Sequence, residues 1–161
     1  MSEELTGNIL IVQDGEPTAT INSALAGAVT EALNHGEIEE IYGALNGLRG
    51  IMSEDLIDLA EESQQAIRGL RFTPGAALGV SRGSVKRLEE FERILGVLKA
   101  HNITFLLLIG DRESQEAGSS LVALAESQGH TLRIVGLPSS LSNELSMTDH
   151  CPGYGSVAKL V

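Results

Sequence analysis

Apolar residues recur along the chain in short blocks with two different spacings. Unbroken aliphatic or β-branched runs predict buried strands, and the clearest cover Asn8–Val12, Ile38–Tyr42, Thr104–Ile109 and Thr131–Val135. Residues 76–80, which are small and apolar, predict one more strand. The run TFLLLI at 104–109 has almost no polar position, which is typical of a central strand in a parallel sheet.

Between these runs the apolar residues are spaced three or four apart, which predicts amphipathic helices. The predicted helices cover residues 18–34, 53–63, 85–101 and 113–128, and a last helix starts at 156. Ser53 is a good N-cap, and Glu54 and Asp55 suit the positive end of a helix dipole. The segment NGLRGIM before Ser53 reads as a glycine-marked turn.

Strands and helices therefore alternate along the chain. This order predicts a Rossmann-like α/β three-layer sandwich with a mainly parallel five-stranded sheet and right-handed crossovers. The length predicts a single domain over residues 1–161. Ligands of such folds bind at the carboxyl ends of the strands. These ends are the segments 13–18, 46–51, 81–84, 110–114 and 137–155.

The charge of the chain limits its partners. Asp and Glu outnumber Lys and Arg by 22 to 11, so the formal net charge is -11. Nucleic acid and anionic membranes both require clustered cations, so neither is expected as a partner. A phosphorylated small molecule or a phosphate anion stays possible, because backbone amides at a helix start hold phosphate without net positive charge.

Cysteine content and the first residues predict the compartment. The single cysteine, Cys151, cannot form an internal disulfide, so a reducing cytoplasm is expected. MSEELTGN has no basic region followed by an apolar stretch, so no signal peptide is predicted. The longest apolar run, Phe105–Ile109, is far too short to cross a bilayer.

Two loops at the predicted strand ends could hold phosphate or a metal ion. In QDGEPT, Gly15 and Thr18 could present amides to a phosphate, although the same residues suit an ordinary turn capped by Thr18. In IGDRES, Asp111 or Glu113 could bind a divalent cation. Acidic residues also favour a helix N-terminus with no metal, and Arg112 beside them weakens the metal interpretation.

Two further features of the sequence are candidate sites. Arg82 could clamp a phosphate at a strand end or lie solvated at the rim. His150 and Cys151 are adjacent, which rarely lets a nucleophile and its base face each other, so no catalytic pair is predicted. A four-ligand zinc site is not expected with one cysteine.

Five long stretches form a recognisable set in chain order. They are PTATINSALAG, IYGALNGLRGIMSEDLIDL, TPGAALGVSR, ERILGVLKAHNI and TDHCPGYGSVAKLV. Together they resemble the N-terminal part of the phosphofructokinase family, most closely its pyrophosphate-dependent branch, over nearly the whole chain. The resemblance implies a parallel α/β sheet. For the family it implies a glycolytic reaction, magnesium-dependent phosphoryl transfer from pyrophosphate or ATP to the 1-hydroxyl of fructose 6-phosphate.

This chain departs from the family in the motifs that carry the chemistry. Where the pyrophosphate branch has Gly-Gly-Asn-Asp-Ser, residues 110–114 read GDRES, which puts Asp111 at the second glycine and Arg112 at the amide. Where the family has Pro-Lys-Thr-Ile-Asp-Asn-Asp, residues 138–144 read PSSLSNE. Ser139 then stands at the lysine that neutralises pyrophosphate, and Ser142 at the aspartate that acts as base.

The first loop also becomes more negative than its counterpart in the family. The family's Gly-Gly-Gly-Pro-Thr is Asp14-Gly15-Glu16-Pro17-Thr18 here, which adds two carboxylates where an anion should lie. Stabilisation of a transferring phosphoryl group needs positive charge and preorganised donors. The resemblance therefore implies a catalytically inactive domain with no catalytic residue and no metal ligand, which keeps weak phosphate or nucleotide binding or an assembly role.

Some residues of these loops are still expected to bind ligand. The candidates for phosphate or nucleotide are Gly15, Thr18, Arg82, Gly110 and Ser114, and those of the substrate loop are Asn143, Gly153, Gly155 and Ser156. No cofactor is certain, and magnesium with pyrophosphate or ATP is expected only if the family chemistry survives.

Length leaves two alternatives open. Family members are about twice as long or more, and their second half supplies most sugar-phosphate contacts, so this chain resembles a truncated form. One alternative is an active 6-phosphofructokinase completed by another chain, with Glu144 or a water as base. The other is a small-anion binding module that uses Gly15, Thr18 and Ser114. Apolar surface left without its second half predicts a homo-oligomer or association with that half.

Overall fold

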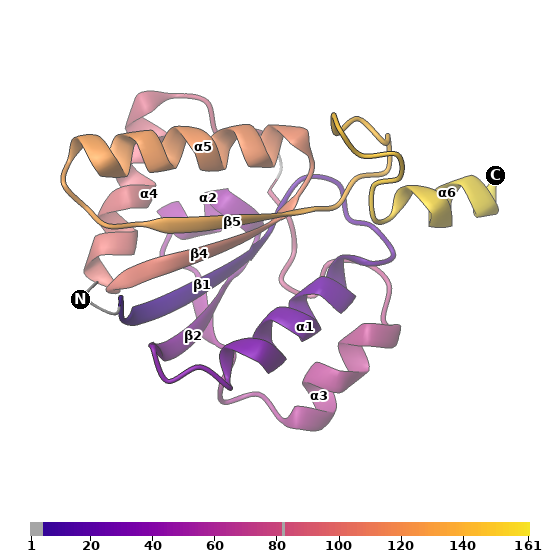
Figure 1. The fold of residues 1–161 in the computed structure, drawn as a ribbon, viewed down its shortest axis with the longest axis horizontal. Coiled ribbons are helices and arrows are strands. Elements are labelled where there is room, and N and C mark those ends of the chain that lie inside the picture. Colours follow the sequence, from indigo (N-terminus) through magenta and orange to yellow (C-terminus); the bar gives the residue numbers. More distant parts are fainter. Residues whose placement is uncertain (1–4, 82) are drawn as a thin grey trace.

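The computed structural model describes residues 5–81 and 83–161 and shows an α/β three-layer arrangement around one sheet (Figure 1). The strands are β1 Gly7–Gln13, β2 Ile38–Ala44, β3 Leu56–Asp58, β4 Ile103–Gly110 and β5 Arg133–Pro138. They lie in the order β3-β2-β1-β4-β5. β1 pairs parallel with β2 and β4, β4 pairs parallel with β5, and β3 pairs antiparallel with β2. The predicted fold class is confirmed.

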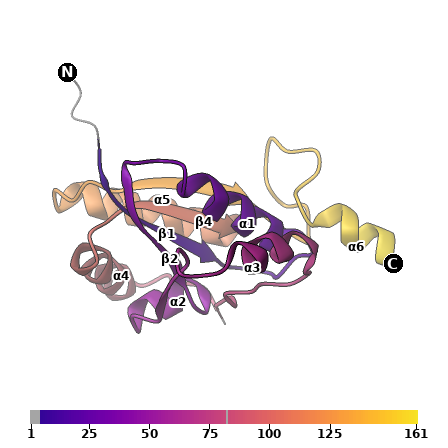
Figure 2. The same ribbon diagram turned by 90° about the horizontal axis from the view of Figure 1, so that it is seen from below.

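Helices cover both faces of the sheet (Figures 1 and 2). They are α1 Ile21–Ala32, α2 Gly47–Met52, α3 Gln64–Gly69, α4 Leu88–Ala100, α5 Arg112–Ser127 and α6 Tyr154–Leu160, with a 3₁₀ turn at Leu70–Phe72. Buried side chains of α1 and α3 pack on one face, and those of α2, α4 and α5 on the other. None of the helices in the described part of the chain is long and apolar enough to span a membrane.

β1 explains why the sheet has two cores. Every residue of β1 is buried, and its side chains alternate between the faces. Leu10 and Val12 join the cluster under α2, α4 and α5, while Ile9 and Ile11 join the cluster under α1 and α3. A strand covered on both faces must be apolar at successive positions, which is the pattern that the sequence shows.

The segment around Ser53 differs from its prediction. The predicted turn NGLRGIM is helix α2, Ser53 is its C-cap, and Glu54 follows in the left-handed region with a φ of 58°. The helix predicted to follow is replaced by strand β3, in which Leu56 pairs with Ala44. The free edge of β2 accounts for the difference. Its backbone N–H and C=O groups can form hydrogen bonds with an added strand, but a helix would offer them no partners.

Residues 76–80 do not form the predicted strand. Two of their backbone N–H groups bond to side chains in place of a strand ladder. Gln13 Oε1 accepts the N–H of Leu78 at 2.9 Å, and Asn22 Oδ1 accepts that of Ala77 at 2.8 Å. Gln13 and Asn22 are themselves buried and bonded to each other at 3.0 Å. These two amides therefore fix the segment as a loop beside β1.

The β5 side of the sheet is less covered than the rest. Val135 on β5 is 54% exposed, and Phe105, Leu107 and Leu137 on the α1 face are only partly buried. α6 has no buried residue and projects from the body of the domain in both views (Figures 1 and 2). The described chain thus has apolar surface on β4, β5 and α6 that nothing in it covers.

The core makes a direct stability prediction. Leu106 on β4 is 1% exposed, so Leu106→Ala should lower the free energy of unfolding by about 2–5 kcal/mol through lost burial and a cavity. Leu33→Ala is the matched control, because Leu33 is 54% exposed and should change stability by less than about 0.5 kcal/mol. Urea unfolding followed by circular dichroism measures both, and equal effects would contradict the burial pattern.

Candidate functional site

A cavity of about 190 Å³ opens at the carboxyl ends of β1 and β4. The β1–α1 loop contributes Asp14 and Gly15, and the start of α5 contributes Ser114 and its neighbours. A further wall is formed by Ser81, Gly83, Ser84 and Val85. These four residues, together with Lys86 and Arg87 just before α4, are called the strap here. Parallel α/β folds bind ligands at this end of the sheet, so the cavity is the candidate site.

Asp14 is the most enclosed charge of the cavity. It follows β1 directly, is 6% exposed, and donates its backbone N–H to Ile109 O at 2.9 Å. Its Oδ1 accepts the N–H of Ser81 from the strap at 3.1 Å, and its Oδ2 lies 3.5 Å from Ser114 Oγ. Asp14 therefore ties the strap and α5 to the end of β1.

Asp111 caps helix α5 with its own carboxylate. Its Oδ1 accepts both the backbone N–H of Ser114 at 3.0 Å and the Ser114 hydroxyl at 2.9 Å. Its Oδ2 lies against Gly15, where a Cβ would be only 2.3 Å away. Gly15 also has a φ of +73°, so no other residue fits there without strain. The carboxylate thus lies between the helix start and the β1–α1 loop.

Glu113 and Arg112 have different surroundings. Glu113 accepts a hydrogen bond from the Ser84 hydroxyl and lies 3.6 Å from Lys86 Nζ, and both partners hold the pKa of Glu113 below its ordinary value. Arg112 pairs with Glu116 one turn along the exposed side of α5. The positive charge of Arg112 is therefore engaged by Glu116.

The cavity is acidic as a result. Asp14, Asp111 and Glu113 line it, and no lysine or arginine does so among the residues that the structure describes. Asp111 and Glu113 already accept hydrogen bonds, and no set of three His, Cys, Asp or Glu side chains is placed for a metal within the described ranges. The residues present do not fit the magnesium ion that the family chemistry implies.

Thr18 and Ser139 close the neighbouring loops against each other. Their hydroxyl oxygens are 2.8 Å apart and buried, with Ser139 2% exposed. A Cβ at Gly153 would lie 2.6 Å from the Thr18 side chain, so only glycine lets the two loops meet. Thr18 is not the predicted helix cap, because α1 begins at Ile21 with Thr20 as N-cap. The hydroxyl of Thr18 lies 2.8 Å from Ser139 Oγ and also accepts the backbone N–H of Thr20 at 3.3 Å.

The loop that follows β5, residues 139–153, is held in place by its own side chains. Asn143 Oδ1 accepts the N–H of Cys151 at 2.8 Å, and Asn143 Nδ2 donates to Asp149 O at 3.0 Å. Asn143 has a φ of 56°, which asparagine tolerates better than most residues. The hydroxyl of Ser142 lies 3.1 Å from that of the fully buried Ser140. Both ends of the Asn143 amide therefore bind the loop backbone.

The predicted residues fall into three groups. Gly15 and Ser114 line the cavity, and Gly110 lies beside it, where a Cβ would be 2.7 Å from Ser114 Oγ. Thr18, Asn143 and Gly153 belong to the closed loops. Gly155 and Ser156 are exposed on α6. Arg82 lies outside the described residues.

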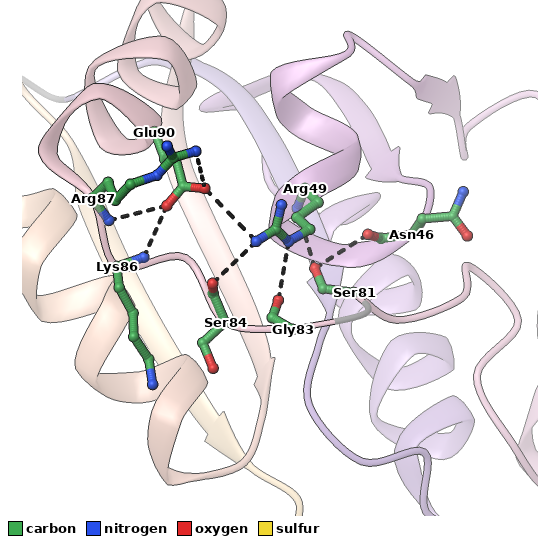
Figure 3. Close-up of polar contacts among 8 residues, drawn as sticks. All are labelled: Asn46, Arg49, Ser81, Gly83, Ser84, Lys86, Arg87 and Glu90. Atoms are coloured by element: carbon green, nitrogen blue, oxygen red, sulfur yellow. Dashed lines mark hydrogen bonds and ion pairs between the residues drawn. The ribbon is translucent and has the colours of Figure 1, made fainter.

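Sequence reasoning missed the polar cluster that anchors the strap (Figure 3). Glu90, with a side chain 9% exposed, accepts the backbone N–H groups of Arg87 at 3.0 Å and Lys86 at 3.1 Å, and the Arg87 guanidinium at 3.2 Å. These donors lower the pKa of Glu90 to about 2. They also delay the start of α4 to Leu88, three residues after the predicted one.

Arg49 of α2 completes this cluster. Its Nε donates to Gly83 O at 3.2 Å, and its Nη2 donates to Ser84 O at 3.3 Å and lies 3.7 Å from Glu90 Oε1 (Figure 3). Glu90 and Arg49 are 41 positions apart in the sequence. No local sequence signal could have paired them.

Fold and site together define a mainly parallel α/β protein with a loop-built cavity at the strand ends. The sequence matches the phosphofructokinase family over residues 8–161, so the chain belongs to this family and the predicted resemblance is confirmed.

Three relatives show the range of this similarity. A pyrophosphate–fructose 6-phosphate 1-phosphotransferase of Xanthomonas campestris is 40% identical over 157 residues, which cover 95% of this chain and 37% of that protein. An ATP-dependent 6-phosphofructokinase of Amycolatopsis methanolica is 25% identical, over 91% of this chain and 31% of that one. The crystal structure of a pyrophosphate-dependent phosphofructokinase from Marinobacter aquaeolei superposes with a TM-score of 0.90 at 37% identity, over 96% of this chain and 38% of that chain. The chain therefore spans well under half the length of these relatives.

Glu90 predicts how stability depends on pH. Because its pKa in the fold is about 2, below the ordinary 4.5, its carboxylate stabilises the fold above pH 4.5, and this contribution is lost as the pH falls toward 2. Glu90→Gln should therefore be less stable than wild type at pH 6, and the gap should narrow between pH 5 and 3.

Urea unfolding at a series of pH values measures this gap. Glu89→Gln, one exposed position earlier on the same helix, is the control and should give a small gap that does not narrow in the same way. A gap for Glu90→Gln that stays constant over this pH range would contradict the assignment.

Proposed function

We propose that this phosphofructokinase-family domain does not bind the phosphates of pyrophosphate or ATP in its cavity, is catalytically inactive, and has a binding or assembly role. The observation that carries the proposal is the position of Asp111. Its carboxylate accepts the N–H and hydroxyl of Ser114 at the start of α5 and lies against Gly15. A helix N-terminus and a glycine loop together suit an anion, and here the anion belongs to the chain itself.

Electrostatics favour the same conclusion. A pyrophosphate in the cavity would meet Asp14, Asp111 and Glu113, with no basic lining residue in the part of the chain that the structure describes. Catalysis of phosphoryl transfer requires the opposite arrangement, with cations or fixed donors around the developing charge. Three carboxylates would oppose both binding and transfer.

The loop that the family uses for its base supports inactivity as well. By resemblance Ser142 stands at the catalytic aspartate, and a neutral hydroxyl cannot accept the proton of a sugar hydroxyl at neutral pH. Ser139 stands by resemblance at the lysine, and its side chain is buried against Thr18. A lysine at position 139 would have to bury its charge or part the two loops.

Binding measurements test the role of Asp111. Wild type should show no calorimetric heat with pyrophosphate or ATP up to millimolar ligand. Asp111→Gly should bind pyrophosphate at least about tenfold more tightly, since removing one charge near the ligand changes the interaction by on the order of 1–4 kcal/mol.

Glu16→Gln is the matched control for this experiment. It removes one exposed charge from the β1–α1 loop but leaves the Asp111 carboxylate in place, so it should bind no better than wild type. Binding by wild type, or equal gains in both variants, would overturn the blocking role of Asp111.

Activity measurements test inactivity separately. Purified protein with fructose 6-phosphate, magnesium and either pyrophosphate or ATP should show no turnover above buffer. Ser142→Asp should also be inactive, because Asp111 still fills the space between Ser114 and Gly15. Turnover by wild type would refute the proposal, and rescue by Ser142→Asp would show that only the base is missing.

A second candidate function is supported by the uncovered apolar surface. Val135 is 54% exposed and Leu160 on α6 is 90% exposed, and the chain spans 37% of the Xanthomonas campestris relative. The domain would then act as one part of an enzyme completed by another polypeptide. Mixing it with the separately expressed remainder of such a relative should give co-sedimentation and turnover, and independent sedimentation would exclude this candidate.

A further inference from the structure

We propose that Arg49 is the positioning residue of the cavity wall, acting through the backbone of the strap. The inference concerns how the cavity is built and does not rest on the proposed function. Arg49 lies on α2 and does not line the cavity itself. Its effect on the site passes through Gly83 and Ser84, which do line it.

The contacts of Arg49 hold the strap at several points. Its backbone N–H donates to Ser81 Oγ at 3.1 Å, and its guanidinium donates to the carbonyls of Gly83 and Ser84. The fork of an arginine can satisfy two adjacent carbonyls and still face a carboxylate. Glu90, 3.7 Å from Nη2, supplies that carboxylate (Figure 3).

These bonds decide which way the strap faces. A trans peptide is planar, so its N–H points opposite to its C=O. With the carbonyls of Gly83 and Ser84 turned toward Arg49, the N–H groups of Ser84 and Val85 point away from it. Arg49 therefore fixes the direction in which the N–H groups of Ser84 and Val85 point, which is away from α2. It does so before any ligand binds.

Other contacts of the strap are weaker candidates for this role. Lys86 and Glu113 form a pair whose side chains are 70% and 49% exposed, and exposed pairs contribute little. Arg87 bonds to Glu90 with a side chain that is 73% exposed, and it makes no bond to a strap carbonyl among the described contacts. Arg49 alone joins Glu90 to the strap carbonyls in the described part of the chain.

Amide hydrogen exchange followed by NMR on the full chain tests the proposal. The reporters are the N–H groups of Ser81, bonded to Asp14, and of Lys86, bonded to Glu90. In Arg49→Met both should exchange at least about tenfold faster, while amides of β1 and β4 keep their rates. Arg87→Met is the matched control, because it removes the other cation at Glu90, and both reporters should stay within about twofold of wild type.

Arg49→Lys separates positioning from charge. Lysine keeps a cation near Glu90 but cannot bond two carbonyls with a rigid fork, so this variant should exchange like Arg49→Met. Wild-type exchange in Arg49→Lys would show that charge alone matters and would overturn the proposal. Equal acceleration in Arg87→Met, or faster exchange throughout β1 and β4, would overturn it too, by assigning the effect to Glu90 neutralisation or to global stability.

Discussion

The Asp111 carboxylate, through its hydrogen bonds to Ser114 and its contact with Gly15, joins the three elements on which the cavity depends. Asp111 directly follows β4, Ser114 lies in the first turn of α5, and Gly15 of the β1–α1 loop contacts the same carboxylate. A helix start leaves backbone donors unpaired, and they must find an acceptor. In this chain the acceptor is internal, so the end of the sheet is complete without a ligand.

The surrounding loops follow the same principle of internal satisfaction. Thr18 and Ser139 bond to each other across the two loops, and the Asn143 amide closes the segment that follows β5. The strap is fixed by Glu90 and Arg49. Buried polar groups are costly unless they are bonded, so the buried Thr18–Ser139 pair in particular stabilises the conformation in which the two loops meet. The site is thus a network of chain-to-chain bonds around an acidic space.

This protein has the fold of its family, but its cavity has a different charge from the one that phosphoryl transfer requires. The backbone follows a pyrophosphate-dependent phosphofructokinase structure with a TM-score of 0.90, while the cavity is lined by three carboxylates. A fold is maintained by its apolar core, and this chain has a cluster of buried apolar side chains on each face of the sheet. Site residues can change without disturbing that core, which is why similarity of fold alone does not establish activity.

The amino-acid sequence by itself determined the sheet, its central strands, four of the main helices and the family. These depend on local periodicity and on long continuous motifs, which are readable along the chain. Only the tertiary structure showed that residues 56–58 form a strand, because the free edge of β2 lies outside that segment. Only the tertiary structure showed that the side chains of Gln13 and Asn22 bond to the backbone of residues 76–80, where a strand had been predicted. It also showed that Arg49 lies beside Glu90. Each of these contacts joins residues far apart in the sequence, where neither partner carries a signal of the other.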